Sequence, residues 1–206
     1  MQIYETRSRQ RKLVCLASSR GGANQLNVNG KPPTSPAAWA AMQKLLEETG
    51  VKSVAPQEVA SAQRRGTVVI DIRPAKDFDE YHIPGSVNVP FYRPIEGWSG
   101  KQLVRRVAFA FFGVFNGTEY NQNFVQEAQS EIVDTDKGAI LVCGLGGELQ
   151  GPGGAERTPR AQTRSLMAAY ELANAGVRNL VTLRGGFSGW IEAGRDVSSN
   201  VHDLSS

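Results

Sequence analysis

The sequence predicts an α/β fold in which a mostly parallel central sheet carries helices on both faces. Short runs rich in β-branched and apolar residues alternate with helical patterns, and these runs are apolar on both faces. Glycine or proline marks most boundaries between them. With 206 residues, 40% of them hydrophobic, the chain is long enough for one sizeable core, so one domain is the default expectation.

The first half of the chain is expected to contain two helices followed by two strands. Ser35 and Pro36 form an N-cap followed by a proline at the first helical position, and Gly50 supplies a C-terminal stop. A second, short helix is expected from Pro56 to Arg65. A strand, a turn and a further short strand are then expected at residues 67–72, 82–86 and 87–90.

The second half is expected to continue the alternation after an inserted segment. Residues 101–132 predict a mostly helical insert, interrupted around residues 116–118. The apolar run 139–142 predicts a buried strand that leads directly to Cys143. After a glycine- and proline-rich stretch, a helix, a strand and a short helix are expected at about residues 163–175, at 179–183 and from 185 onward.

The basic charge of the chain is concentrated at its N-terminal end. Residues 1–31 hold six of the 23 Lys and Arg residues and one of the 20 Asp and Glu residues, which leaves 17 basic and 19 acidic residues in the remainder. The body is therefore nearly neutral, and its charge gives no support to nucleic-acid binding. The leader lacks a continuous apolar h-region and resembles an organelle transit peptide more than a secretory signal.

These features divide the chain into three parts. We expect a disordered, transit-peptide-like leader at residues 1–34, a single domain at 35–196 and a polar C-terminal tail at 197–206. A disordered basic tail is the other interpretation of the leader. Composition alone leaves both chloroplast and mitochondrion open as destinations.

One apolar segment raises the question of membrane contact. No apolar run reaches the ~18–20 residues that span a bilayer. Residues 107–115 are apolar, include four phenylalanines and follow Arg105 and Arg106, so peripheral membrane contact through 105–115 is an alternative to packing in the core.

Cys143 is the first candidate for chemistry. It ends a buried strand and is followed by glycines, which leave room for a partner molecule. The other cysteine, Cys15, lies in the basic leader, and two cysteines make no disulfide framework. Asp71 also lies at a predicted strand end, so Asp71 and Cys143 could face one crevice. A small buried hydrophobe is the alternative role for Cys143.

With these elements assigned, the chain resembles the rhodanese (sulfurtransferase) domain. The resemblance covers residues 56–195 and consists of a first signature followed by a strand–cysteine–helix segment and a Gly-Gly…Trp ending. The matching segments are Asp71-Ile72-Arg73, Asp77-Phe78, His82-Ile83-Pro84-Gly85-Ser86-Val87-Asn88-Val89-Pro90, Cys143, Arg164-Ser165 and Gly185-Gly186-Phe187-Ser188-Gly189-Trp190.

The resemblance implies an activity and its partners. A family thiol accepts sulfane sulfur from a small anionic donor such as thiosulfate, forms a persulfide and passes the sulfur to a thiol or cyanide-like acceptor. Cys143 would be that thiol, and no cofactor is implied. The thiolate is the nucleophile, and a helix N-terminus, guanidinium groups and inward backbone N–H groups would favour it.

The other matched residues receive roles that the sequence leaves partly open. Asp71 is expected to accept backbone N–H bonds in the turns, and His82 to fix its loop rather than act as a base. Arg73 is expected to bind the anionic donor, or to pair with Asp77 or another local acid. Arg164 at the helix start is expected on the substrate side, with a solvated surface position as the alternative. No metal is expected, because His82 has no second ligand in view.

The chain departs from the family pattern in the loop after Cys143. A compact loop would place the arginine about five residues after the cysteine, whereas Arg164 lies 21 positions beyond it. The insertion at 144–163 either bulges outward and leaves Cys143 facing the helix start, or dismantles the anion nest. Such insertions, like the insert at 101–132, resemble those of plant and algal plastid rhodanese-like proteins.

Three functions follow from these observations. A plastid sulfurtransferase that uses Cys143 is favoured, and a catalytically weak or inactive scaffold, associated with a plastid membrane, is the alternative. A thiol phosphatase is disfavoured by the long interval between Cys143 and Arg164. The glycines after Cys143 do not form a dinucleotide-binding loop, because Leu149 stands where the third glycine is needed, and no P-loop is present.

Overall fold

The centre of the domain is a five-stranded sheet in the order β1-β7-β6-β2-β3, and every neighbouring pair is parallel. The computed structural model describes residues 26–94, 118–149 and 162–201. The strands are β1 (Lys52–Val54), β7 (Leu180–Leu183), β6 (Ala139–Val142), β2 (Val68–Asp71) and β3 (Val87–Asn88). The predicted α/β fold with a mostly parallel sheet is confirmed.

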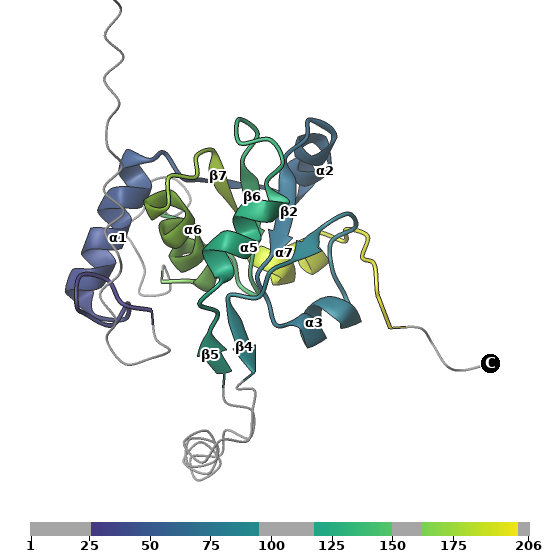
Figure 1. Ribbon diagram of the computed structural model, residues 1–206. Coiled ribbons are helices and arrows are strands. Elements are labelled where there is room, and N and C mark those ends of the chain that lie inside the picture. Colours follow the sequence, from purple (N-terminus) through teal and green to yellow (C-terminus); the bar gives the residue numbers. More distant parts are fainter. Residues whose placement is uncertain (1–25, 95–117, 150–161, 202–206) are drawn as a thin grey trace, which may run out of the picture.

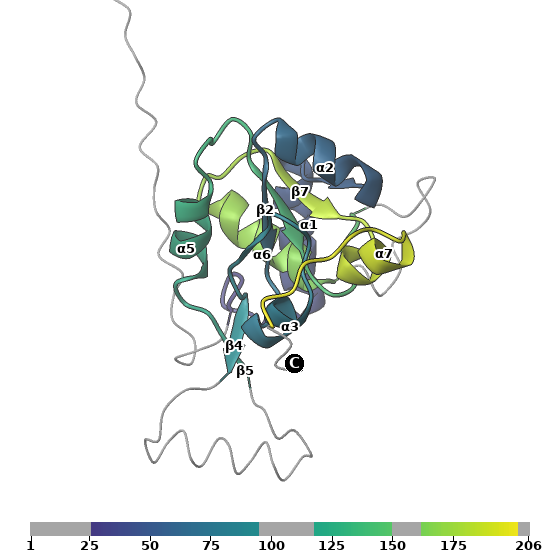
Figure 2. The same cartoon turned by 90° about the vertical axis from the view of Figure 1, so that its right-hand side faces the viewer.

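Helices cover both faces of this sheet, as predicted (Figures 1 and 2). On one face lie α1 (Pro36–Glu48), α5 (Phe124–Glu131) and α6 (Arg164–Asn174), and on the other lie α2 (Pro56–Arg64) and α7 (Gly186–Glu192). Because successive strand side chains point to opposite faces, Leu141 packs in the α1–α6 core and Val142 in the α2–α7 core. A further helix, α3 (Ala75–Glu80), follows β2.

Local signals located most of these elements correctly. The Ser35 side chain accepts a hydrogen bond from the Ala38 N–H at 3.2 Å, which is the N-cap contact expected for α1. Helices α2, α6 and α7 and strands β2, β3, β6 and β7 all lie within the predicted ranges. Strand β1 and helix α3 were not predicted, because three and six residues are too few to show a period.

The helical prediction for residues 101–132 is wrong at Glu119 and Tyr120, directly after the predicted interruption around residues 116–118. Residues Thr118–Tyr120 form strand β5, which pairs antiparallel with β4 (Tyr92–Pro94). Tyr92 and Tyr120 face each other in this ribbon, and both rings meet the buried Phe91 edge-on, with centroids 5.1 and 5.2 Å away. Tertiary packing of aromatic rings therefore decides the conformation here. Helix α5 is the helical part of the insert that lies in the described residues.

The folded domain begins earlier than the predicted boundary at residue 35. Leu26 and Val28 are 7% and 1% exposed and belong to the α1–α6 core. The side chain of Gln162 donates a hydrogen bond to the Pro33 carbonyl at 2.8 Å. Residues 26–34 are therefore part of the domain. The sequence did not predict this, because two apolar residues give no periodic signal. The rest of the predicted leader lies outside the described residues.

The predicted C-terminal tail also contacts the domain over its first residues. His82 and Ser198 exchange two backbone hydrogen bonds of 2.9 Å, and the Asn200 side chain donates to the Asp79 carboxylate at 2.9 Å. The tail therefore covers the turn after α3.

The sequence made two predictions about membranes, and only one of them concerns residues that the structure describes. In the described part of the chain, no helix combines the length and apolar character needed to cross a bilayer. The predicted peripheral contact through residues 105–115 lies outside the described residues and stays a prediction.

Candidate active site around Cys143

Strand β6 carries Cys143 to the carboxyl edge of the sheet. All four residues of β6 are buried, and Cys143 itself is 3% exposed. The first turn of α7 holds the backbone that follows the strand. The N–H of Phe187 donates to the Cys143 carbonyl at 2.8 Å, and the N–H of Ser188 donates to the Gly144 carbonyl at 3.0 Å. The cysteine backbone is therefore fixed by a neighbouring helix.

The sulfur of Cys143 faces the start of α6. The thiol donates to the hydroxyl oxygen of Ser165, with an Sγ–Oγ distance of 3.4 Å. Ser165 is fully buried, and its Oγ also lies 3.1 Å from the Thr163 hydroxyl. Burial disfavours the charged form of a thiol, so a nucleophilic role requires groups that stabilise the anion. A helix start and a hydroxyl are groups of this kind.

The two ends of the insertion at 144–163 lie next to each other. A Cβ atom added to Gly147 would overlap the Thr163 hydroxyl and come within 2.8 Å of Leu166 Cγ. The Thr182 hydroxyl donates to the Gly147 carbonyl at 2.5 Å and holds that end of the loop against β7. The chain thus leaves and re-enters the site at one point, and Cys143 faces the helix start despite the insertion. Residues 150–161 lie outside the described part of the chain.

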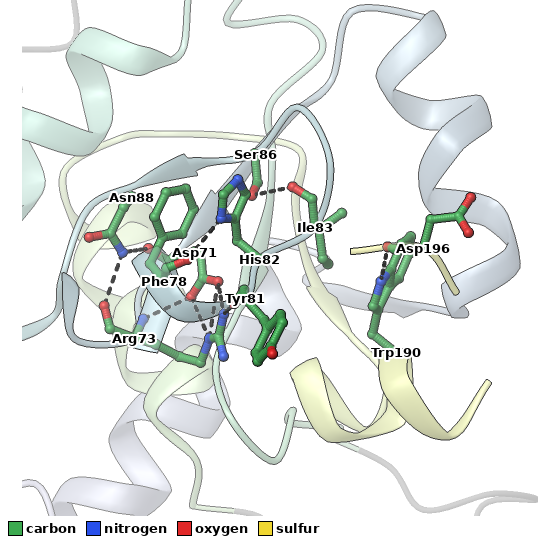
Figure 3. A network of polar contacts seen from close by, with 10 residues as sticks. All are labelled: Asp71, Arg73, Phe78, Tyr81, His82, Ile83, Ser86, Asn88, Trp190 and Asp196. Atoms are coloured by element: carbon green, nitrogen blue, oxygen red, sulfur yellow. Dashed lines mark hydrogen bonds and ion pairs between the residues drawn. The ribbon is translucent and has the colours of Figure 1, made fainter. Parts of the chain in front are cut away.

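Asp71 and Arg73 form a buried ion pair (Figure 3). The Arg73 Nε lies 3.0 Å from both Asp71 carboxylate oxygens, its Nη2 lies 2.7 Å from Oδ2, and its backbone N–H donates to Oδ1 at 3.0 Å. Nη2 also donates to the Tyr81 carbonyl at 2.6 Å. The acid that pairs with Arg73 is thus Asp71 rather than Asp77. Donor binding by Arg73 stays a prediction.

Asp71 and Cys143 do not face one crevice, contrary to the sequence-based expectation. Asp71 is in register with Val142, which packs in the α2–α7 core, whereas Cys143 packs in the α1–α6 core. Successive side chains along a strand point to opposite faces of the sheet. Cys143 is one residue beyond Val142, so its side chain points to the face opposite that of Asp71. Phe187 connects the two groups, because the Arg73 Cζ lies 3.6 Å from its ring centroid while its N–H holds the Cys143 carbonyl.

His82 and Asn88 hold the loops around this ion pair (Figure 3). The His82 Nδ1 lies 2.8 Å from the Phe78 carbonyl, and its ring stacks on Phe78 with centroids 4.0 Å apart. The Asn88 amide donates to the carbonyls of Asp71 and Arg73 at 2.9 and 3.0 Å. These contacts suit the predicted loop-supporting role of His82. Within the described ranges, no group of three His, Cys, Asp or Glu residues is arranged to hold a metal ion.

Arg164 opens α6 immediately before Ser165 and is exposed. Its Cζ lies 5.3 Å from the ring centroid of Tyr92. Burial raises the pKa of Tyr92, and the positive charge of Arg164 partly offsets this. Glu171 lies two turns further along α6, and its carboxylate accepts a hydrogen bond of 3.3 Å from the Tyr120 hydroxyl of β5. Burial raises the pKa of Glu171. The substrate-side role of Arg164 stays a prediction.

Sequence reasoning did not assign a site role to Ser165, Thr163 or Phe187. Ser165 and Thr163 are separated from Cys143 by the insertion, so their distance along the chain suggests no contact. The available signal was topological: in a parallel sheet, the helix after a strand begins near that strand's carboxyl end. Hydroxyl residues at such a helix start are therefore candidates for contact with a thiol at the strand end.

Substituting Gly186 by alanine is expected to distort the cysteine loop. Gly186 has φ +58°, and a Cβ there would overlap the Cys143 carbonyl oxygen and the Gly146 backbone nitrogen. Left-handed strain and overpacking together predict a loss of about 2–4 kcal/mol in the free energy of unfolding, measured in urea. Gly50→Ala is the matched control, because its φ is +72° and nothing lies within 4 Å of the added Cβ. Equal losses in the two variants would contradict the close packing.

Comparison with known proteins identifies related sequences over most of the chain. The family model of the Rhodanese-like domain matches residues 55–193. The chloroplastic Rhodanese-like domain-containing protein 14 of Arabidopsis thaliana is 35% identical over 184 residues, which cover 87% of this chain and 80% of that protein. Rhodanese-like domain-containing protein 10 of the same plant is 24% identical over 151 residues, covering 71% of this chain and 63% of that protein.

Solved structures with similar folds are more distant. A thiosulfate sulfurtransferase from Pseudomonas aeruginosa aligns with a TM-score of 0.42 and 23% identity, covering 79% of this chain and 23% of that chain. The BH2092 protein from Bacillus halodurans aligns with a TM-score of 0.43 and 19% identity, covering 80% of this chain and 85% of that chain.

Proposed function

Since the chain belongs to the rhodanese-like domain family, we propose that it is a sulfurtransferase that carries sulfane sulfur as a persulfide on Cys143. The observation that carries this proposal is the position of the thiol. Cys143 lies at the carboxyl end of a buried strand, with its sulfur 3.4 Å from a hydroxyl at a helix start. The helix start and its hydroxyl are the groups that can stabilise a thiolate at this position.

The reaction needs two displacements at sulfur. The Cys143 thiolate attacks the outer sulfur of thiosulfate, a new S–S bond forms, and sulfite leaves with the electron pair of the broken bond. A thiol or cyanide acceptor then attacks the terminal persulfide sulfur. The S–S bond breaks, the acceptor keeps the sulfur, and the Cys143 thiolate is regenerated.

The surrounding residues are assigned supporting roles in this reaction. Arg164 is the donor-binding residue, because it is exposed, positively charged and adjacent to the residue that contacts the sulfur. The guanidinium of Arg73 is paired with Asp71 and stacked on Phe187. We therefore assign Arg73 to positioning the cysteine loop, in preference to the donor-binding role that the sequence predicted. Asp71 and His82 support the loops.

The protein belongs in the chloroplast, following its relative from Arabidopsis thaliana that carries this localisation in its name. The basic leader at residues 1–25 is proposed to act as the transit peptide.

Incubation with thiosulfate is expected to add one sulfur atom to Cys143. The experiment uses a Cys15→Ser variant, so that Cys143 is the single thiol of the chain. Intact-mass and peptide mass spectrometry should locate the added sulfur on Cys143, and dithiothreitol should remove it. The control carries Cys143→Ser in the same background and should gain nothing. Absence of an adduct at saturating thiosulfate would leave the scaffold function in place of the enzyme.

A further inference from the structure

We propose that Ser165 and Thr163 form a hydroxyl relay that removes the proton from Cys143 and then holds the resulting thiolate. The inference deepens the proposed function, because it assumes that Cys143 acts as the nucleophile. It adds one catalytic residue, Ser165, which touches the reacting sulfur, and one positioning residue, Thr163, which acts through Ser165.

The problem that this relay solves is set by burial. Cys143 is 3% exposed, so water does not reach its sulfur freely. A buried thiolate is unfavourable unless it receives hydrogen bonds. The Ser165 hydroxyl is fully buried and lies 3.4 Å from Sγ, where the thiol donates to it. Once the thiol proton has moved to the Ser165 oxygen, the same hydroxyl donates to the sulfur.

Thr163 is the residue that indicates a relay. It occupies the N-cap position of α6 with extended backbone angles, φ −102° and ψ 160°, yet its side chain makes no capping hydrogen bond. A threonine at this position ordinarily accepts a backbone N–H from the first turn. Here its hydroxyl lies 3.1 Å from Ser165 Oγ, and either oxygen can be the donor. A Cβ added at Gly147 would overlap this hydroxyl, so the loop packs closely against the Thr163 side chain.

The three groups define a path for one proton. In the proposed resting arrangement, the Cys143 thiol donates to Ser165 and Ser165 donates to Thr163, whose half-exposed hydroxyl can donate to solvent. The thiol proton moves to the Ser165 oxygen, the Ser165 proton moves to Thr163, and the Thr163 proton moves to water. One proton leaves in total, and all three hydrogen bonds reverse direction. Ser165 then donates to the thiolate and Thr163 donates to Ser165.

Other charged groups surround the relay and are left unchanged by the test. Arg164 precedes Ser165 on α6 and lies over Tyr92 of β4. On the loop after β6, Glu148 pairs with Arg184 at 3.1 Å. Arg73 and Asp71 pair with each other on the opposite side of the sheet.

Removing the Ser165 hydroxyl is expected to slow alkylation of Cys143. The rate at which iodoacetamide alkylates Cys143 is measured from pH 5 to 10 in two proteins. One is the Cys15→Ser protein, and the other carries Ser165→Ala in the same background. The substitution removes a hydrogen bond to a charged group, so the rate at pH 7 should fall by about tenfold, with the pH profile displaced to higher pH. An unchanged profile in a folded Ser165→Ala protein overturns the relay.

A matched pair at Thr163 tests the second step and remains informative if Ser165→Ala does not fold. Thr163→Val keeps the shape but removes the hydroxyl, and should slow alkylation at pH 7 by about threefold with the same displacement of the profile. Thr163→Ser keeps the hydroxyl and should restore the original profile. Equal profiles for Thr163→Val and Thr163→Ser contradict the role of Thr163.

The outcome is separable from that of the proposed function. Alkylation reports deprotonation of Cys143 without any sulfur donor. A displaced alkylation profile with no persulfide in the thiosulfate experiment supports the relay and contradicts sulfur transfer. A persulfide on Cys143 with an unchanged profile in Ser165→Ala and Thr163→Val supports sulfur transfer and contradicts the relay.

Discussion

Replacing Cys143 by serine is expected to reduce thiocyanate formation from thiosulfate and cyanide to the uncatalysed background, a loss of about a thousandfold or more. A serine hydroxyl cannot hold the sulfane sulfur, because no S–S bond can form. The change is small in volume, and the new hydroxyl can still hydrogen-bond to Ser165, so thermal unfolding should shift little. The measurement is colorimetric thiocyanate release under saturating thiosulfate.

The control for this prediction is Cys15→Ser, which should keep full activity because Cys15 lies in the leader. Loss of activity in both variants would indicate that the two thiols act together, as in a disulfide exchange. Retained activity in Cys143→Ser would show that the sulfur carrier is another group, and the role of Cys143 would then be packing.

Replacing Asp71 by alanine is expected to lower the free energy of unfolding by about 3–5 kcal/mol, the largest stability effect that the described contacts predict. The Asp71 carboxylate is fully buried and the Arg73 side chain is 10% exposed, so the variant leaves a buried guanidinium without its counter-charge. Urea denaturation measures the loss. Asp77→Asn is the control, since Asp77 is an exposed acid in the first turn of α3 and should change stability by about 0.5 kcal/mol at most.

A double variant separates the charge from the shape of this pair. Combining Asp71→Asn with Arg73→Met removes both charges while keeping similar volumes. It should be less destabilised than Asp71→Asn alone, because an apolar replacement of a buried ion pair is often neutral. Equal destabilisation of the single and double variants would contradict the view that the unpaired charge causes the cost.

Phe187 contacts both Arg73 and Cys143, so a change in the ion pair is expected to affect the cysteine loop. The Arg73 guanidinium lies on the Phe187 ring, and the Phe187 N–H holds the Cys143 carbonyl. A change at Asp71 therefore reaches the cysteine loop through two contacts. The ion pair and the thiol lie on opposite sides of the sheet, so this coupling runs through α7 rather than through a shared crevice.

Most of the elements could be predicted because their signals are local. The Ser35-Pro36 start of α1, the β-branched run of β2 and the apolar run of β6 each depend on a few adjacent residues. The prediction failed at Glu119 and Tyr120, where a strand follows the predicted interruption in place of the expected helix. The partner strand at Tyr92–Pro94 lies far away in sequence, and the aromatic packing that joins them has no local signature.

By itself, the sequence determined the α/β class, the strand end that carries Cys143 and the family to which the chain belongs. These properties depend on short patterns and on motifs of adjacent residues. Tertiary structure alone decided that Asp71 and Cys143 face opposite sides of the sheet, and that Ser165 and Thr163 meet the sulfur across the insertion. The physical reason is that these contacts join residues far apart in the sequence. The order and register of the strands and the alternation of their side chains decide which residues meet, and the residues next to each contact carry no local signal of it.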